Sequence, residues 1–288
     1  MKTRLSRTCL LLSALIGLLA GCMDDENDDN RKRAGKGSFP EVSQILITDT
    51  VMDKTGGGMV YITETYSFAD NRLTTHHTLQ EYAHDQQLEC SYGFAYSGNE
   101  VTLTDESDNE AIYRLGANGF AETCTYRTSS VTREYSFTYT DDYLTRIEEK
   151  INGEVSASAD LEYTSGNLQS IVQTLNNQSY KTLCRTGELE NTYQLPFIRL
   201  ADVYPLSFHT DALYARLLGK QSAHMVIRTE PEGDDVQEWT EYRYTTDEKN
   251  IPVAVTISTT STGVIIDIFG NSSAVTETDS WRRGYRVE

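Results

Sequence analysis

Hydrophobic and polar residues alternate along much of this chain, and the alternation comes in short units that recur. In each unit, an aromatic or aliphatic residue is followed two positions later by another. A step rich in Asn, Gly or Asp comes next, and an apolar residue then restarts the pattern. The units are Tyr66-Ser-Phe68 with Leu73, Phe94-Ala-Tyr96 with Val101, Tyr113-Arg-Leu115 with Phe120, Phe137-Thr-Tyr139 with Leu144 and Ile147, Leu161-Glu-Tyr163 with Leu168 and Ile171, and Tyr242-Arg-Tyr244 with Val255.

Each unit predicts a strand, a turn and a second strand. Residues at positions i and i+2 lie on one face of a strand, and Asn-Gly, Gly-Asn or Asp-rich steps supply the turn. The 18 tyrosines and only five prolines fit a pleated surface. The sequence therefore predicts an all-β fold, a curved antiparallel β-meander of repeated hairpins.

One segment interrupts the strand pattern. Residues 210–219, TDALYARLLG, begin with a threonine, carry an acidic residue in the first turn and end on a glycine. These features predict one short helix near residues 210–219 that covers a sheet face or closes one end of the sheet.

The N-terminus has the features of an export signal. Lys2, Arg4 and Arg7 precede an uncharged apolar run, residues 9–20, which is shorter than the ~20 residues that span a bilayer. Leu19-Ala20-Gly21-Cys22 resembles the lipobox of bacterial lipoproteins. The expected organisation is therefore a signal peptide at 1–21, a flexible acidic tether at 22–38 and a single β-rich domain at 39–288, with lipid on Cys22 anchoring the protein to a membrane.

The repeats resemble the YD repeat of RHS-type surface proteins. The whole mature chain, including Gly219-Lys220-Gln-Ser222-Ala-His224, resembles a family of Bacteroidetes outer-membrane lipoproteins of unknown function. The resemblance implies a curved, open β-sheet and no assigned reaction. The acidic cluster Asp24 to Asp29 resembles the signal that sends such lipoproteins to the cell surface, and the periplasmic face is the alternative.

Charge and cysteine content narrow the partners. Without residues 1–21, 22 basic residues face 43 acidic ones, a net charge of −21, which argues against binding to nucleic acid. In an oxidising envelope, Cys90, Cys124 and Cys184 allow one disulfide, for which Cys90–Cys124 is the preferred pair; three free cysteines are the alternative.

Candidate metal ligands gather in one stretch, His76-His77, Glu81 and His84. On a helix, His77, Glu81 and His84 would share a face, but the repeat predicts a strand here, which places His76 and His77 on opposite faces. These residues are therefore weak metal candidates, and no metal or other cofactor is expected.

Tyrosines on a less buried sheet face could stack on a ligand. Tyr96, Tyr139 and Tyr163 are the candidates, and the alternative is that they belong to the core. Motifs for a nucleophile or a P-loop are absent from the sequence. The expected function is a non-enzymatic, lipid-anchored module that binds a glycan, peptide or protein. The alternatives are a hydrolase of envelope or dietary polymers and a structural subunit of an outer-membrane complex.

Overall fold

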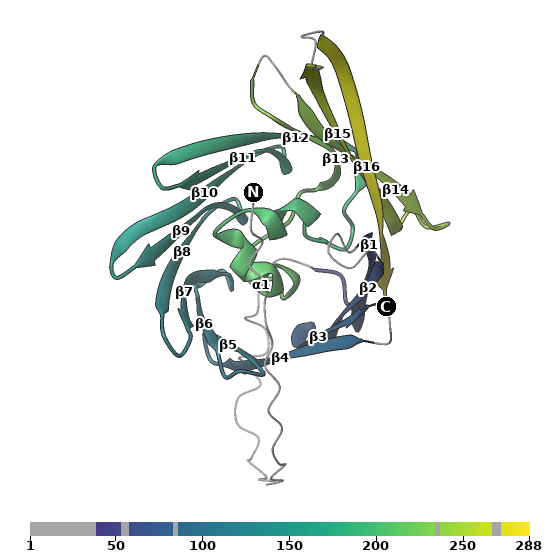
Figure 1. Cartoon of the computed structure of the whole chain (residues 1–288). Helices are drawn as coiled ribbons and strands as arrows, with labels where there is room; N and C mark the ends of the chain where they lie inside the picture. The colour runs from purple at the N-terminus through teal and green to yellow at the C-terminus, as the bar shows by residue number, and fades with distance from the viewer. Residues whose placement is uncertain (1–38, 53–57, 83–85, 234–236, 267–271) are drawn as a thin grey trace.

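The protein is a barrel of antiparallel strands with a helical segment inside it (Figure 1). The computed structural model describes residues 39–52, 58–82, 86–233, 237–266 and 272–288. The strands are β1 Gln44–Met52, β2 Met59–Ala69, β3 Arg72–Glu81, β4 Gln87–Ser97, β5 Glu100–Asp105, β6 Glu110–Leu115, β7 Ala121–Arg127, β8 Thr132–Thr140, β9 Tyr143–Ile151, β10 Glu154–Thr164, β11 Asn167–Leu175, β12 Gln178–Glu190, β13 His224–Pro231, β14 Glu238–Thr246, β15 Pro252–Ile266 and β16 Ser272–Val287.

The predicted all-β meander is confirmed, but the sheet is closed rather than open. Each strand pairs with its sequence neighbour, and β1 pairs with β16, from Ile45 opposite Val287 to Thr50 opposite Arg282. The seam is completed where the Ser43 N–H donates to the Glu288 carbonyl at 2.6 Å. Over these paired residues, closure removes the exposed sheet edges that an open meander would leave.

Tight turns join most neighbouring strands. Five of the two-residue turns have positive φ at both positions, which is the backbone of the type I′ hairpin turn and explains why Asn, Asp and Gly occupy all of these positions except Ser165. These turns are Asp70–Asn71, Asp141–Asp142, Asn152–Gly153, Ser165–Gly166 and Asn176–Asn177.

β-Bulges explain the three-residue spacing within the repeat. On leaving a turn, β3, β9 and β11 each carry one extra residue in the pairing, namely Thr74, Thr145 and Gln169. A bulge shifts the alternation by one position, so that two residues three apart both face inward. This is why Leu144 and Ile147 are both buried, although an uninterrupted strand would place them on opposite faces.

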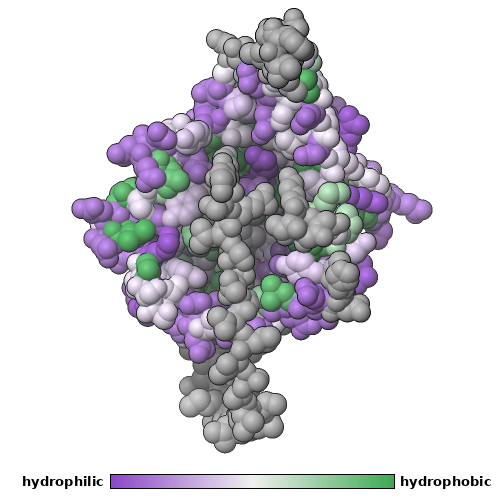
Figure 2. All heavy atoms as spheres, in the orientation of Figure 1, coloured by the Kyte–Doolittle hydropathy of each residue, from purple (hydrophilic) through white to green (hydrophobic). Residues whose placement is uncertain are grey.

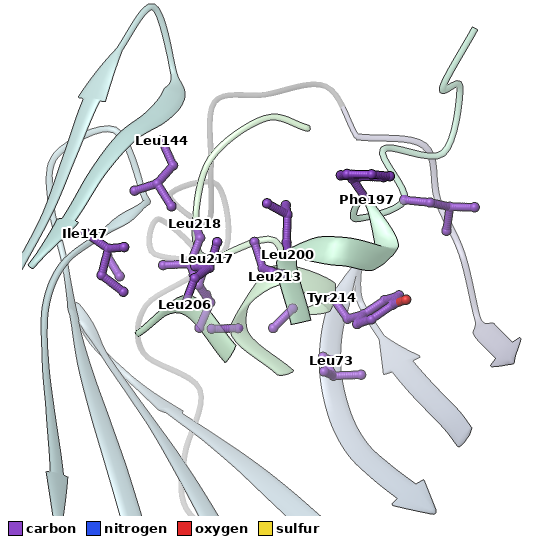
Figure 3. Close-up of a cluster of buried hydrophobic side chains, with 14 of the residues drawn as sticks. Leu73, Leu144, Ile147, Phe197, Leu200, Leu206, Leu213, Tyr214, Leu217 and Leu218 are labelled. Atoms are coloured by element: carbon purple, nitrogen blue, oxygen red, sulfur yellow. The ribbon is translucent and has the colours of Figure 1, made fainter. Parts of the chain in front are cut away.

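A segment between β12 and β13, residues 191–223, fills the barrel and is called the plug below. It contains the short helices η3 Ile198–Asp202, η4 Leu206–His209 and α1 Thr210–Tyr214, which Figure 1 shows inside the ring of strands. Its apolar side chains and those of the wall form one core (Figure 3). Plug residues in that core include Leu195, Phe197, Leu200, Leu206, Leu213, Leu217 and Leu218.

The plug is joined to one end of the barrel, called the plug rim, which carries the turns 70–71, 141–142 and 165–166. Backbone N–H groups of Lys220 and Ala223 donate to the carbonyls of Asp142 and Gly166, each at 2.8 Å. The opposite end, called the far rim, carries the turns 152–153 and 176–177. The plug therefore enters and leaves the barrel through the plug rim.

Helix α1 is shorter than the predicted helix over 210–219 and lies inside the barrel. The helical hydrogen bonds end near Ala215, whose N–H donates to the Asp211 carbonyl. Arg216 then adopts a positive φ of 61°. A left-handed residue stops an α-helix, and the last residues of the segment turn back toward the plug rim instead.

The preferred disulfide is wrong, because none of Cys90, Cys124 and Cys184 forms a disulfide bond in the part of the chain that the structure describes. Cys90 lies on β4 and Cys124 on β7, with two strands between them. Three steps of ~4.8 Å across a sheet separate the Cα atoms by far more than the ~7 Å that a disulfide tolerates.

Candidate functional site

A cluster of ionisable side chains lies where α1 meets the inner wall. It consists of Asp49 from β1, Glu64 from β2, His76 from β3, Asp211 from α1 and Arg283 from β16, and is called the charge cluster below. Asp49 faces Arg283 directly across the closing seam of the barrel. The cluster therefore connects both ends of the sheet to the plug.

The strongest contact in the charge cluster is a two-point ion pair. Arg283 donates from Nε to Asp49 Oδ1 at 2.9 Å and from Nη2 to Asp49 Oδ2 at 2.6 Å. Burial alone would lower the pKa of Arg283, but its hydrogen bonds to Asp49, together with the electrostatic effects of Tyr214, Tyr285 and Asp49, outweigh burial and raise that pKa. Such bidentate pairs fix geometry as well as charge.

Among the described residues, Glu64 has no ion pair of this kind. Burial raises the pKa of its carboxyl group, and the nearby charges of Arg283 and His76 offset this only in part. Because the protonated form of a buried acid is favoured, Glu64 weakens the fold when it is ionised. Within the charge cluster, the Asp49–Arg283 ion pair therefore stabilises the fold, whereas ionised Glu64 destabilises it.

His76 is the centre of the cluster. Its ring stacks between Tyr66 and Tyr92, with ring centroids 4.1 and 5.3 Å away. Its Nδ1 lies 2.7 Å from Asp211 Oδ1, although not in line for a good hydrogen bond, and its Nε2 lies 3.1 Å from Thr78 Oγ1. The carboxylate–imidazole–hydroxyl order is that of a nucleophile relay, but the poor alignment at Nδ1 argues for a structural contact.

A second polar centre holds the plug to the opposite wall. Glu149 on β9 is fully buried and accepts hydrogen bonds from Arg133 at 2.7 Å, Tyr204 at 2.6 Å and Tyr135 at 3.0 Å, and also from Ser156. Burial would raise the pKa of Glu149, but these hydrogen bonds outweigh it and lower the pKa. Tyr204 belongs to the plug, so this carboxylate joins plug and wall.

His209 lies beside this centre and stays neutral. Its Nδ1 is 2.9 Å from the Tyr113 hydroxyl, and the rings of Tyr135 and Phe137 pack edge-on against it at 4.3 and 5.2 Å. Burial lowers the pKa of His209 to about 3. The imidazole therefore packs as an uncharged ring at neutral pH.

The tyrosines that sequence reasoning chose for binding face the barrel interior and not an exposed sheet face. Tyr96 and Tyr139 donate from their hydroxyls to the carbonyls of Leu73 at 3.0 Å and Ala121 at 2.7 Å. Tyr163 packs against Tyr143 at 4.8 Å. All three belong to the periphery of the core, because the repeat positions that they occupy point inward.

The candidate metal ligands are spread over two faces, as expected for a strand. His76 is buried with 6% of its surface exposed, whereas the His77 side chain is 42% exposed and lies 3.8 Å from Glu89. Glu81 accepts a hydrogen bond from Gln87 at 3.1 Å. His84 and Cys22 lie outside the described residues. Within the described residues, no group of three His, Cys, Asp or Glu side chains could hold a metal ion.

Sequence reasoning missed the charge cluster and Glu149. One signal was present in the sequence: Glu149 follows Ile147 by two residues and so shares its inward face. Asp49, Glu64 and Arg283 are distant in the chain, and only the closing of the barrel brings them together.

The outer wall has the opposite polarity from the inner wall. On β8 the outward residues are Thr132, Glu134, Ser136, Thr138 and Thr140, and on β4 they are Gln87, Glu89, Ser91, Gly93, Ala95 and Ser97. Figure 2 looks onto one end of the barrel, where hydrophilic residues are the most common of the coloured ones around the rim and the hydrophobic ones lie in separate small groups. Of the exposed large hydrophobic residues, Met52, Met59 and Tyr61 lie together where β1 pairs with β2, and the others lie elsewhere, namely Val131, Val155, Tyr180, Ile227 and Val253.

The fold and the two polar centres define a class: a sixteen-stranded barrel whose interior is filled by its own chain. Residues 65–254 match the model of a domain of unknown function (DUF4595) with porin-like fold, and the chain belongs to this family. No curated protein matches the chain significantly. Among the described residues, no helix is long and apolar enough to cross a membrane.

Solved structures share this fold, among them two porin-like proteins. A porin-like protein from Bacteroides uniformis is 24% identical, with a TM-score of 0.73 over 87% of this chain and 99% of that one. A porin-like protein from Bacteroides vulgatus is 10% identical, with a TM-score of 0.51 over 86% of this chain and 98% of that one.

Proposed function

We propose that the chain is a non-enzymatic binding module of the bacterial cell envelope, held to the outer membrane by lipid on Cys22 and facing the cell surface. In this proposal the barrel stands in water beside the membrane and does not cross it. The sequence supports the anchor through the lipobox-like Leu19-Ala20-Gly21-Cys22 and the acidic stretch that follows it.

The observation that carries the proposal is the polarity of the barrel. A transmembrane barrel has an apolar outer band and a polar, water-filled interior. Here the outward residues of β4 and β8 are mostly Thr, Ser and Glu, while aromatic and aliphatic side chains from wall and plug fill the interior. A barrel of this kind serves as a rigid scaffold that presents its rims and loops to a partner.

Labelling of growing cells with a radioactive fatty acid tests the anchor. The wild-type protein should incorporate label, and the Cys22→Ser variant should not. Protease treatment of intact cells then tests the orientation: a domain that is cut while a periplasmic control survives supports surface exposure. A labelled Cys22→Ser variant, or a protected domain, would contradict the anchor or the orientation respectively.

Measurements of ion conductance across a planar bilayer test whether the barrel is a closed scaffold, as proposed, or an ion-conducting channel. The purified lipidated protein should leave the bilayer electrically silent, because the plug and core side chains occupy the interior. Stable single-channel steps would overturn the proposal, whichever partner the protein binds.

A further inference from the structure

The β15–β16 hairpin extends past its neighbours at the far rim. With 15 and 16 residues, these are the longest strands of the barrel, and Figure 1 shows β16 reaching beyond the ring. β1 pairs with β16 only from Arg282 to Val287, whereas β15 pairs with it from Ser272 onward. Among the described residues, the edge of β16 from Ser272 to Trp281 therefore has no strand beside it.

The hydrogen-bonding groups on that edge can be assigned. Glu288 and Gln44 exchange hydrogen bonds, with Glu288 N–H donating to Gln44 O at 2.9 Å and Gln44 N–H donating to Glu288 O at 3.2 Å. Pairing along β16 runs without a register shift from this point. Because backbone groups alternate sides along a strand, the even-numbered residues Ala274, Thr276, Thr278 and Ser280 direct their N–H and C=O groups to the open edge.

The side chains around the edge have one sign of charge. Between Pro252 and Trp281 the sequence has no lysine or arginine. Glu277 and Asp279 share the inner face of β16, and Glu238 flanks the same Ser261 that pairs with Glu277. All three carboxylates are exposed. An extended partner with basic side chains at alternate positions would meet these carboxylates.

The edge has few of the features by which proteins block strand pairing. It has no proline, lysine or bulge between Ser272 and Trp281. A second copy of this chain would bring Glu277 and Asp279 toward the same residues of the partner, and the mature chain carries a net charge of −21, so self-pairing is unfavourable. The hairpin also lies at the rim opposite Ser43, where the N-terminal tether joins the barrel.

From these observations, and resting on the proposed function as a binding module, we infer that the open edge of β16 binds an extended, cationic protein segment by strand addition. The main-chain groups of Ala274, Thr276, Thr278 and Ser280 would supply the ladder. Glu277 and Asp279 would select Lys or Arg at alternate positions of the partner.

The test uses the full lipidated protein in nanodiscs and a fluorescent ten-residue peptide of alternating Lys and Thr. The peptide should bind with an affinity that falls as salt is added. A peptide of alternating Glu and Thr should not bind, and neither should the Lys–Thr peptide with alternate backbone nitrogens methylated. Equal binding of the methylated peptide would overturn strand addition, as would no binding of the parent peptide.

Matched variants at one position separate backbone from side chain. Thr278→Pro removes an N–H on the open edge without removing one that pairs with β15, and should weaken peptide binding at least tenfold with thermal unfolding nearly unchanged. Thr278→Val keeps the N–H and should bind like wild type. Glu277→Gln with Asp279→Asn should weaken binding and flatten its salt dependence. Wild-type affinity in Thr278→Pro, or dimers of the free protein in sedimentation, would contradict the inference.

Failure of this inference is distinguishable from failure of the proposed function. Fatty-acid labelling and bilayer silence do not depend on the peptide. If the protein incorporates fatty acid and leaves the bilayer silent but does not bind the peptide, the proposed function is supported and the inference about the β16 edge is wrong.

Discussion

The wall and the plug of the barrel use their residues in different ways. The wall repeats one unit, so that each inward aromatic has equivalents on other hairpins, such as Phe137 and Phe94. The plug has no repeat, and several of its polar groups have specific partners, such as Tyr204 with Glu149 and His209 with Tyr113. We therefore expect the loss of a wall contact to lower the free energy of unfolding only a little, because equivalent contacts on other hairpins remain. The loss of a plug contact should lower it more, because no equivalent contact exists.

The largest effect should follow the loss of the carboxylate that joins plug and wall. Glu149→Ala leaves Arg133 as a cation without its partner and removes acceptors from two tyrosines, so it should lower the free energy of unfolding by ~3–5 kcal/mol. Denaturant titration measures this. The control is Glu148→Ala on the outer side of the same strand, where the loss should be at most ~1 kcal/mol. Equal losses would show that plug and wall are not joined at Glu149.

Two glycines give the next contrast. Gly219, in the plug, has φ +81°, and a Cβ there would lie 2.5 Å from the Asp142 carbonyl oxygen, whereas Gly98, in a wall turn, has φ +58° and open space around it. Gly219→Ala should cost ~2–4 kcal/mol from strain and overlap, and Gly98→Ala ~1 kcal/mol from strain alone. A shift in the melting temperature that is as large for Gly98→Ala as for Gly219→Ala would remove this distinction between plug and wall.

The plug should also control the response to acid. The pKa of His209 is lowered by burial from 6.5 to about 3, so the unfolded chain binds a proton over that range and the folded protein does not. Stability is therefore lost as the pH falls from about 6.5 toward about 3. His209→Gln keeps an acceptor for Tyr113 but cannot titrate. The substitution should lower the free energy of unfolding by ~1–3 kcal/mol at neutral pH. Below neutral pH, the free energy of unfolding should depend less on pH than in the wild type.

Unfolding midpoints at several pH values compare the two proteins. Glu149 contributes in the same direction at lower pH, because its lowered pKa means that its stabilisation is lost as the pH falls through the folded value. A slope between pH 6.5 and 4 that is unchanged in His209→Gln would show that another group causes it.

The smallest effect belongs to the outer wall. His77→Ala should change the free energy of unfolding by no more than ~0.5 kcal/mol, since the side chain is 42% exposed and its nearest acid is 3.8 Å away. Added zinc should leave the melting temperatures of wild type and variant equal. A zinc-dependent rise only in the wild type would restore the metal site once considered for His77, Glu81 and His84.

The wall was predictable from the sequence because its unit is local. The pairs Phe137 and Tyr139, the turn Asp141–Asp142 and the spacing from Leu144 to Ile147 encode a hairpin and its bulge within eleven residues. Closure was not predictable, because it depends on sixteen small strand rotations that bring β1 to β16. The open sheet was the natural expectation from the repeat alone.

The polar centres were not predictable for a related reason. Asp49 and Arg283 are at opposite ends of the chain and become neighbours only at the closing seam. An open sheet would place Tyr96, Tyr139 and Tyr163 on a less buried face, whereas in the filled barrel these residues point inward and pack against the core. Within the plug, the leucines at 213 and 217 fit a helical period and predict a helix over 210–219, but α1 ends at Tyr214 because Arg216 adopts a positive φ.

The central claim is that this barrel stands in water and is not embedded in a bilayer, and its two tryptophans test that claim directly. Trp239 lies on the outer face of β14, stacked with Arg228 at 5.1 Å, while Trp281 lies on the inner face of β16. The lipidated protein is placed in vesicles whose acyl chains carry bromine, which quenches nearby tryptophans. The account predicts unchanged fluorescence, with Trp281→Phe used to isolate Trp239. Strong quenching of Trp239 would place the outer wall in the membrane and contradict the account.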